Sequence, residues 1–144
     1  MRDGVATTAR PLSFLSFDFG TRRVGVASGN TLLKRAAPLR TLEVEGDACF
    51  AAIQSLISEW RPDALVVGVP FHPDGAEHDN TRRARRFARQ LQGRYGLPVH
   101  EVDERYTTTE ALSERAADAD AAAAAIILNQ YLQALPEAKH DAAA

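Results

Sequence analysis

The stretch Phe14–Gly29, FLSFDFGTRRVGVASG, decides how the chain is organised. Two apolar runs, Ser13–Asp18 and Val24–Ser28, flank the polar segment FGTRR, which is too short to cross over a sheet. A connection of this length predicts an antiparallel hairpin. Asp18 is the one acid in the stretch, and it stands where the first run ends. The carboxylate is therefore expected at the end of a strand, beside the glycine of a turn.

The rest of the chain predicts a mixed sheet with helices. ALVVGV at residues 64–69 is a continuous apolar run, which is typical of a central strand covered on both faces. Pro38 favours an edge position or a bulge for the strand that contains it. The order β-β-β-α-β-α-β-α-α predicts an α/β fold, a mixed five-stranded sheet flanked by helices. After the hairpin we expect strands at Lys34–Val44, Ala64–Val69 and Leu97–Glu104, and helices at Asp47–Trp60, Thr81–Tyr95, Thr108–Ala116 and Asp120–Leu135.

Length and composition are those of an ordinary globular domain. The 144 residues are 45% hydrophobic and 25% charged, which is enough for one core. We expect one domain at residues 13–135, with flexible tails at 1–12 and 136–144. A single cysteine and four scattered histidines exclude a disulfide framework and a zinc cluster. Because no segment resembles a signal peptide or a membrane span, we expect a cytoplasmic protein that has no membrane partner.

Acidic residues end two of the predicted strands. In sheets of this kind, ligands gather at the carboxyl ends of the parallel strands. Asp18 ends the first strand, and Asp103 and Glu104 end the fifth. Neighbouring residues on a strand point to opposite faces, so only one of Asp103 and Glu104 can enter a shared site, and periodicity leaves the choice open. The alternative interpretation of Asp18 is an aspartate that only starts a turn.

The last predicted helix begins with an acid on its apolar side. A buried carboxylate needs a cation or hydrogen-bond donors, because burying it unpaired is costly. Asp118 points to nearly the opposite side of the helix and is better suited to cap it. Asp120 is therefore a candidate metal ligand. At 3.6 residues per turn, the side of the helix that carries Asp120 also carries Ala123, Ala124, Ile127 and Tyr131.

The helix predicted at Thr81–Tyr95 has a cationic face. No acid occurs from Thr81 to Pro98. In a chain of net charge −2, this concentration of arginine favours a nucleic-acid partner over a merely solvated surface. Such arginines contact phosphate and give no base specificity. The cationic stripe contains Arg82, Arg85, Arg86 and Arg89, and the opposite side contains Ala84, Phe87, Ala88 and Leu91.

Four segments together resemble one family. They are FDFGTRRVGVA, VVGVPFHPDG with the following TRRARRFA, VDERYTTTEA, and DADAAAAAIILNQYL, in the family's order across residues 13–133. The chain is similar in these segments to the YqgF family, also called RuvX, of pre-16S rRNA nucleases related to Holliday-junction resolvases. The resemblance implies an RNase H-like fold and a nuclease centre of acidic residues that binds divalent metal, Mg²⁺ or Mn²⁺.

The same resemblance implies individual site residues. Asp18, Glu104 and Asp120 correspond to the catalytic, metal-binding acids, and either Asp103 or Asp118 is a candidate for a fourth ligand. Asn129 stands where the family usually has glutamine, which affects helix packing more than chemistry. The family motif also implies that Gly20, Arg22, Arg105, Thr107 and Thr108 belong to the site or its surroundings. The predicted nucleic-acid contacts are Arg22 and Arg105, together with Arg82, Arg85, Arg86 and Arg89 of the cationic stripe.

The resemblance implies a function, and alternatives remain beside it. We expect a metal-dependent nuclease that processes the 5′ end of pre-16S rRNA during ribosome biogenesis, as a monomer or homodimer. A Holliday junction resolvase acting on branched DNA, and a non-catalytic RNA-binding module of the same fold, are the alternatives. The hairpin also looks like the first phosphate loop of actin/hexokinase-like ATPases. Those proteins enclose the nucleotide between two such domains, so we expect no ATP binding from this single domain.

Overall fold

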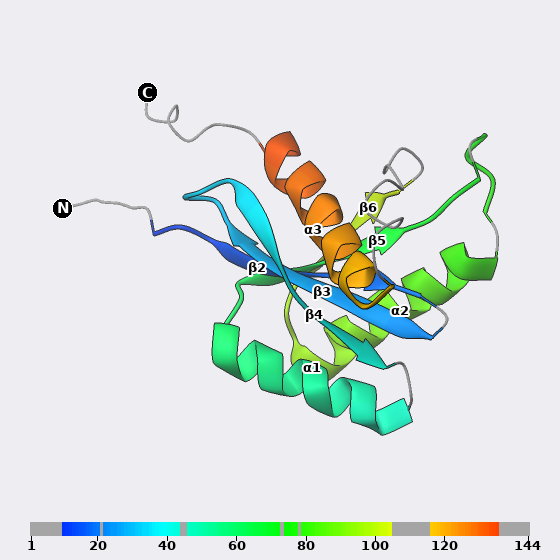
Figure 1. Ribbon diagram of the computed structural model, residues 1–144, viewed down its shortest axis with the longest axis horizontal. Coiled ribbons are helices and arrows are strands. Elements are labelled where there is room, and N and C mark those ends of the chain that lie inside the picture. The colour runs from blue at the N-terminus through cyan, green and yellow to red at the C-terminus, as the bar shows by residue number, and fades with distance from the viewer. Residues whose placement is uncertain are drawn as a thin grey trace.

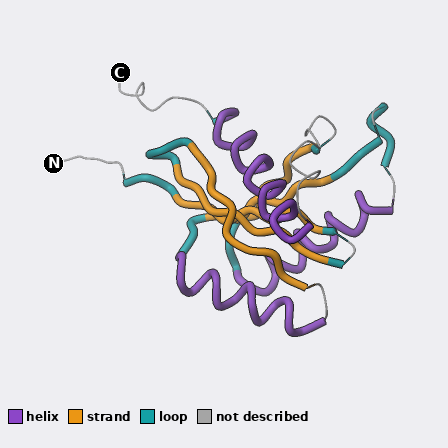
Figure 2. Tube along the Cα trace, viewed as in Figure 1, coloured by secondary structure: helices purple, strands orange, loops and turns teal. Residues whose placement is uncertain are grey.

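The computed structural model describes residues 10–20, 22–43, 46–72, 74–77, 79–104 and 116–135, and shows a twisted sheet between helices (Figure 1). The five strands lie in the order β4-β3-β2-β5-β6. Helices α1 and α2 cover one face of the sheet, and α3 lies diagonally across the other (Figure 2). The elements are β2 Ser13–Phe19, β3 Arg23–Asn30, β4 Arg35–Glu43, α1 Gly46–Trp60, β5 Ala64–Val69, α2 Asp79–Tyr95, β6 Val99–Asp103 and α3 Ala116–Ala134.

The pairing of the strands confirms the predicted mixed sheet. β2 and β3 form the expected antiparallel hairpin, in which Asp18 lies opposite Gly25. β2 also pairs with β5, and β5 with β6, both in parallel. β4 is an edge strand, and its register with β3 shifts beside Pro38, which pairs with Ala27. Both effects expected of this proline are therefore present, since proline cannot donate to a ladder.

Two hydrophobic cores fill the two faces of the sheet. On β2, Leu15 and Phe17 enter the core beneath α1 and α2, while Phe14 enters the core beneath α3. Ser16 lies on the α3 face too, where its buried hydroxyl donates to the Ala124 carbonyl at 2.8 Å. Because side chains alternate along a strand, Asp18 shares the α3 face with Phe14 and Ser16. The alternation of β2 thus assigns its single acid to the side of the sheet that α3 covers.

The start of α3 differs from the prediction. The helix begins at Ala116, four residues before the expected start at Asp120. Alanine has the highest helix propensity of all residues, so the alanine-rich run extends the helix toward the N-terminus. Ala116 consequently belongs to α3, and the rest of the helix predicted at Thr108–Ala116 lies outside the described residues. Asp118 is the third residue of α3, so the expectation that it caps the helix is wrong.

Of the two predicted tails, residues 10–12 are described by the structure. Residues 1–9 and 136–144 lie outside the described residues. No helix in the described part of the chain is both long enough and apolar enough to cross a membrane.

Candidate active site

Asp18 lies beneath the first turns of α3, near the carboxyl end of β2. Its backbone pairs with Gly25 of β3, and continuing the β2–β5 register from the Phe17–Val67 pair brings Gly68 beside it. Burial, and after it the nearby negative charge of Asp120, together raise the pKa of the Asp18 carboxyl to about 6. Asp120 is therefore close enough to Asp18 to disfavour the charged form of the Asp18 carboxyl.

Glu104 joins the same face of the sheet from the neighbouring strand. It follows the last residue of β6, and its N–H donates to the Val69 carbonyl at 3.0 Å. Burial, followed by the negative charges of Asp18 and Asp103, raises the pKa of the Glu104 carboxyl to about 8. Glu104 alternates with Val102, which packs in the core beneath α3, whereas Asp103 falls on the opposite parity. Of the two acids left open by the sequence, Glu104 is thus the one on the face of Asp18.

Asp120 comes from the second turn of α3 and is held by an arginine. Its Oδ2 accepts a hydrogen bond from Nε of Arg23 at 2.5 Å, and the Arg23 and Asp120 side chains are 40% and 23% exposed. The sequence prediction that Asp120 points inward and needs a partner agrees with this geometry. The partner itself was missed, because Arg23 was assigned to the turn. As the first residue of β3 it shares the face of Gly25, and that alternation was the available signal.

Two glycines make the room in which these acids meet. A Cβ at Gly25 would lie 1.8 Å from the backbone oxygen of Asp120, so α3 rests directly on β3 at this point. A Cβ at Gly68 would lie 2.7 Å from Oε2 of Glu104 and 2.4 Å from Cδ1 of Ile127. Real Cβ atoms essentially never show such contacts. Gly25 is therefore required to seat the helix that carries Asp120, whereas a side chain at position 68 would displace the ends of the Glu104 and Ile127 side chains.

The three acids lie near one another but do not form a preformed metal-binding site. In the ranges that the structure describes, no three His, Cys, Asp or Glu side chains stand close enough together to hold an ion. The Asp120 carboxylate is engaged by Arg23, a cation that offsets part of the charge of the cluster. The structure thus brings Asp18, Glu104 and Asp120 to one end of one face of the sheet, and their catalytic and metal-binding roles remain predictions.

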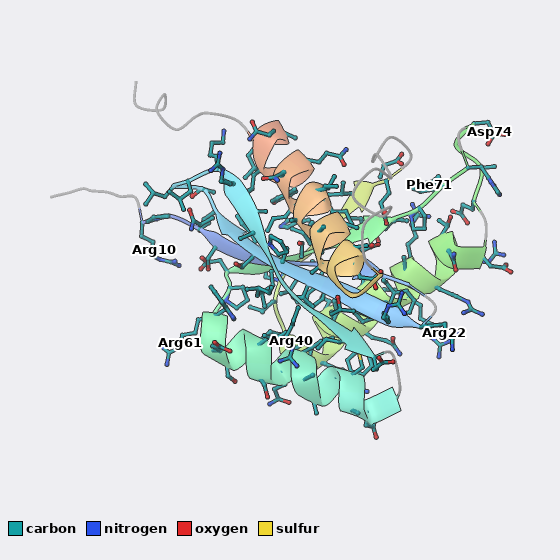
Figure 3. The ribbon with its side chains drawn as sticks, in the orientation of Figure 1. Arg10, Arg22, Arg40, Arg61, Phe71 and Asp74 are labelled. Carbon is teal, nitrogen blue, oxygen red and sulfur yellow. The ribbon has the colours of Figure 1, made fainter. Side chains whose placement is uncertain are left out.

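The other predicted site residues fall into two groups. Gly20 makes the tight turn between β2 and β3, since its N–H donates to the Arg23 carbonyl at 2.9 Å. Arg22 is exposed at the same turn, at the end of the hairpin (Figure 3). The predicted nucleic-acid contact Arg105 and the predicted site neighbours Thr107 and Thr108 lie outside the described residues.

The arginine helix is amphipathic as predicted, but part of its charge is neutralised. Its buried side contains the four expected residues and Thr81. Arg82 pairs with Asp79 at 2.6 Å, and Arg85 pairs with Glu77 at 2.7 Å and with Glu101 at 3.4 Å. All three acids lie outside the acid-free segment: Asp79 begins α2, Glu77 lies in the loop before it, and Glu101 lies in β6. The spacing of residues along α2 could not reveal these ion pairs. Within the described chain, the arginines of α2 without an acidic partner are Arg83, Arg86, Arg89 and Arg94.

The raised pKa values predict that the metal-free protein loses stability as the pH rises. The folded chain holds protons on Asp18 and Glu104 up to pKa values of about 6 and about 8, above their ordinary values of 3.8 and 4.5. The folded state therefore binds more protons than the unfolded state, and the stability that is present below pH 4 falls progressively up to about pH 8. In EDTA we expect the melting temperature at pH 8 to lie about 4 °C or more below that at pH 5.

Circular dichroism melts of three proteins test this pH dependence. Glu104→Gln, which removes one of the two partly buried charges, should flatten the profile above pH 5. Glu59→Gln is the matched control, since Glu59 is exposed on α1. If the melting temperature of the unmodified protein stayed constant or rose from pH 5 to pH 8, the raised pKa values of Asp18 and Glu104 would be contradicted.

Comparison with known proteins gives the family and the fold. A family model described as RuvX, Holliday junction resolvase, matches residues 12–134. A protein of Polaromonas sp. (strain JS666 / ATCC BAA-500), named "Putative pre-16S rRNA nuclease", is 62% identical over 129 residues, covering 90% of this chain and 94% of that one. A relative of the same name from Paraburkholderia phytofirmans is 51% identical over 135 residues, covering 89% of this chain and 92% of that one.

A solved structure shares the architecture. RuvC of T. thermophilus, solved in complex with a Holliday junction substrate, superimposes with a TM-score of 0.57 at 16% identity, covering 85% of this chain and 94% of that one. At this identity the likeness shows the fold alone, and it confirms the RNase H-like fold that the sequence predicted. A family model that spans nearly the whole chain, and relatives this similar over most of their length, lead to one conclusion: the chain belongs to the RuvX family.

Proposed function

We propose that this protein is a nuclease that hydrolyses phosphodiester bonds with divalent metal held by Asp18, Glu104 and Asp120. The observation that carries the proposal is the meeting of three carboxylates at one end of the α3 face, with Gly25 and Gly68 making the room. A purely structural core gains nothing from such crowding, because unpaired buried charges are destabilising. A cation that binds between the carboxylates would offset the unfavourable energy of their mutual repulsion and burial.

The donor set fits a hard divalent cation. All three side chains offer only carboxylate oxygens, which are the ligands that Mg²⁺ and Mn²⁺ prefer. The pKa of Asp18 is raised in part by Asp120, and that of Glu104 in part by Asp18, so the cluster carries negative charge that protein cations leave partly uncompensated. Asp18 and Glu104 would hold the metal, and Asp120 would join them once it is released from Arg23. Asp103, on the opposite parity of β6, has less support as a fourth ligand.

The chain's own residues would bind and orient the phosphodiester. Bound metal supplies Lewis-acid stabilisation of the phosphoryl charge and an activated water. Arg22, exposed at the hairpin turn, and Arg23, freed from Asp120 at the start of β3, would lie next to each other at the end of the turn that follows Asp18. Guanidinium groups donate in pairs to phosphate oxygens, so these two arginines would orient the scissile group beside the acids.

We infer that the substrate is RNA and, more narrowly, pre-16S rRNA. The names of the similar proteins support this substrate. The start of α2 is tied to the site end of β5, because the Thr81 hydroxyl donates to the Pro70 carbonyl. Arg85 also lies over the ring of Phe71, 5.2 Å from its centroid. A nucleic acid that leaves the acids could therefore continue past Phe71 onto α2. An enzyme that trims rRNA acts where ribosomes assemble, so the proposal also assigns the protein to the cytoplasm.

The unpaired arginines of α2 should carry most of this contact. We expect Arg86→Glu combined with Arg89→Glu to weaken RNA binding, and to reduce the salt dependence of binding by about two phosphate contacts. Fluorescence anisotropy with a labelled RNA at several salt concentrations measures both effects. Arg40→Glu, a single charge reversal of the same kind on exposed β4, is the control. If RNA affinity depended on salt concentration equally in the double variant and the parent protein, the proposal that α2 contacts the RNA would be wrong.

The substrate is tested by comparing two nucleic acids side by side. A 16S rRNA precursor with a 5′ extension and a four-way DNA junction are incubated with the protein in Mg²⁺, in Mn²⁺ and in EDTA. Trimming of the RNA that requires metal supports the proposal. Preferential cutting of the junction would instead favour a resolvase, the activity in the family model's description. Binding of either substrate without any cleavage would favour the non-catalytic module.

A further inference from the structure

The large apolar side chains that the described residues expose gather at one end of the molecule. They are Leu12, Leu32, Leu33 and Trp60, which are 45%, 72%, 68% and 42% exposed. The N–H of Leu12 donates to the Thr31 hydroxyl at 2.9 Å, and the N–H of Thr31 donates to the Leu12 carbonyl at 2.9 Å, so Leu12 lies beside the turn that carries Leu32 and Leu33. Exposed apolar residues that cluster in this way mark interaction sites more often than scattered ones do.

A cavity of about 310 Å³ lies within this cluster. Leu33 lines it from the turn between β3 and β4, and Trp60 and Pro62 line it from the end of α1 and the residue pair that follows. Phe14, Ala36 and Ala37 add to its apolar lining. The cavity is therefore a concave, mainly apolar hollow bounded by exposed side chains, a shape that accepts a protruding side chain of another molecule.

The turn that presents the leucines is firmly built. The Asn30 side chain accepts a hydrogen bond from the N–H of Leu33 at 2.8 Å, and the Asn30 carbonyl accepts one from Lys34 at 2.9 Å. Lys34 takes a left-handed conformation with φ of 52° to close the turn. Turn tips normally carry polar residues, and nothing in this hydrogen bonding requires leucine at positions 32 and 33. The two leucines are thus held outward by a turn that would fold equally well with polar residues.

The charges around the cavity are mainly positive. Segments 10–14, 28–37 and 59–63 surround it and contain Arg10, Lys34, Arg35 and Arg61 against the two acids Glu59 and Asp63. Asp63 is already engaged by Arg10 at 2.8 Å. Arg35 also lines the cavity itself. Figure 3 shows Arg10 and Arg61 at this end of the molecule, with Arg22 at the opposite end.

We propose that this surface, named here the TLLK surface after residues 31–34, docks a protein segment in which a large apolar side chain is flanked by carboxylates. The apolar side chain would enter the cavity between Leu33 and Trp60, and the carboxylates would meet Arg35 and Arg61. The cationic rim argues against a second copy, since a two-fold contact through the same patch would bring like charges together. A cavity of this size accepts one inserted side chain, which favours a peptide segment over a bilayer.

The position of the TLLK surface suits a partner that leaves the acids accessible. Asp18 and Glu104 lie at the carboxyl ends of β2 and β6, whereas Phe14 and Ser13, at the start of β2, line the cavity. A protein bound there would hold this chain by the end of the sheet opposite the acids.

A random peptide library displayed on phage tests the proposal with the full chain. Peptides selected on the protein should combine Trp, Phe or Leu with Asp or Glu. Their affinity for the protein should fall as the salt concentration rises. A synthetic copy of the most enriched peptide should lose at least about tenfold in affinity against Leu33→Ser and against Arg35→Glu. Arg40→Glu, the same change on exposed β4, should bind it normally, and all three variants should melt like the parent protein.

Five results would overturn the proposal. Selected peptides that are basic, or whose binding ignores Leu33→Ser, would remove the stated partner chemistry. A dimer in analytical ultracentrifugation that Leu33→Ser dissociates would assign the surface to a second copy. Binding to phosphatidylcholine–phosphatidylglycerol vesicles that Leu33→Ser abolishes would assign it to a membrane. Loss of RNA affinity in Arg35→Glu, but not in Arg40→Glu, would assign it to nucleic acid.

Discussion

Asp18→Asn is expected to lower metal-dependent cleavage of RNA by at least about 10²-fold. A bound metal provides several kcal/mol of transition-state stabilisation, and each 1.36 kcal/mol corresponds to a factor of about ten in rate. Asparagine keeps the shape of the side chain but removes the charge that attracts the cation. Because burial and Asp120 already raise the pKa of Asp18 to about 6, a neutral side chain suits the metal-free fold. Activity should therefore fall while the melting temperature at pH 8 is maintained or rises.

Gel-based cleavage rates and melts of the same preparations separate a lost ligand from a damaged fold. Asp47→Asn is the control, because Asp47 is an exposed acid in the first turn of α1. Full metal-dependent activity in Asp18→Asn would refute the role proposed for Asp18. A large loss of stability together with activity would show that Asp18 holds the fold instead.

Gly25→Ala is expected to cost about 3 kcal/mol or more of folding free energy. The added methyl group would lie 1.8 Å from the Asp120 backbone oxygen and 2.2 Å from its carbonyl carbon. Overpacking of a core against side chains costs about 1–3 kcal/mol, and here the opposing atoms are backbone, which cannot rotate away. Helix α3 would have to lift from β3, taking Asp120 with it. We expect urea unfolding to show the loss, and RNA cleavage to fall even in the folded fraction.

Gly93→Ala is the matched control for this substitution. Gly93 lies within α2, where an added Cβ meets no atom within 4 Å. Alanine there should be neutral or stabilise the helix by up to about 1 kcal/mol. Equal urea midpoints for Gly25→Ala and the unmodified protein would mean that α3 does not rest on β3 as the structure has it.

The sequence predicted those elements whose pattern is local. The central strand Ala64–Val69 has the bounds expected from its apolar run, and the hairpin and the effects of Pro38 are also confirmed. The start of α3 was placed four residues too late. Periodicity locates the buried face of a helix but not its end, and the alanine-rich run contains no stop signal.

The parts of the site that sequence missed depend on contacts between elements. Arg23 pairs with Asp120, which lies 97 residues away in the sequence. The predicted strand began at Val24, one residue too late, so Arg23 was not assigned to a face of the sheet. Likewise, Arg85 of α2 is partly neutralised by Glu101 of β6, which spacing along the helix cannot show. Asp120 itself could be predicted as inward-facing, because its place on the apolar side of α3 is a property of that helix alone. Local patterns thus indicated Asp18 and Asp120 but left Asp103 and Glu104 open. The tertiary fold brings Glu104 to the face of Asp18 and Arg23 to Asp120.

The most direct test of the metal centre is anomalous diffraction from crystals of the full chain soaked in Mn²⁺. The account predicts a manganese peak in contact with the carboxylates of Asp18 and Glu104, with Asp120 released from Arg23 to join them. Crystals of Asp18→Asn should lack the peak. Manganese bound elsewhere, or absent from these three acids in a protein that cleaves RNA with Mn²⁺, would contradict the proposed centre.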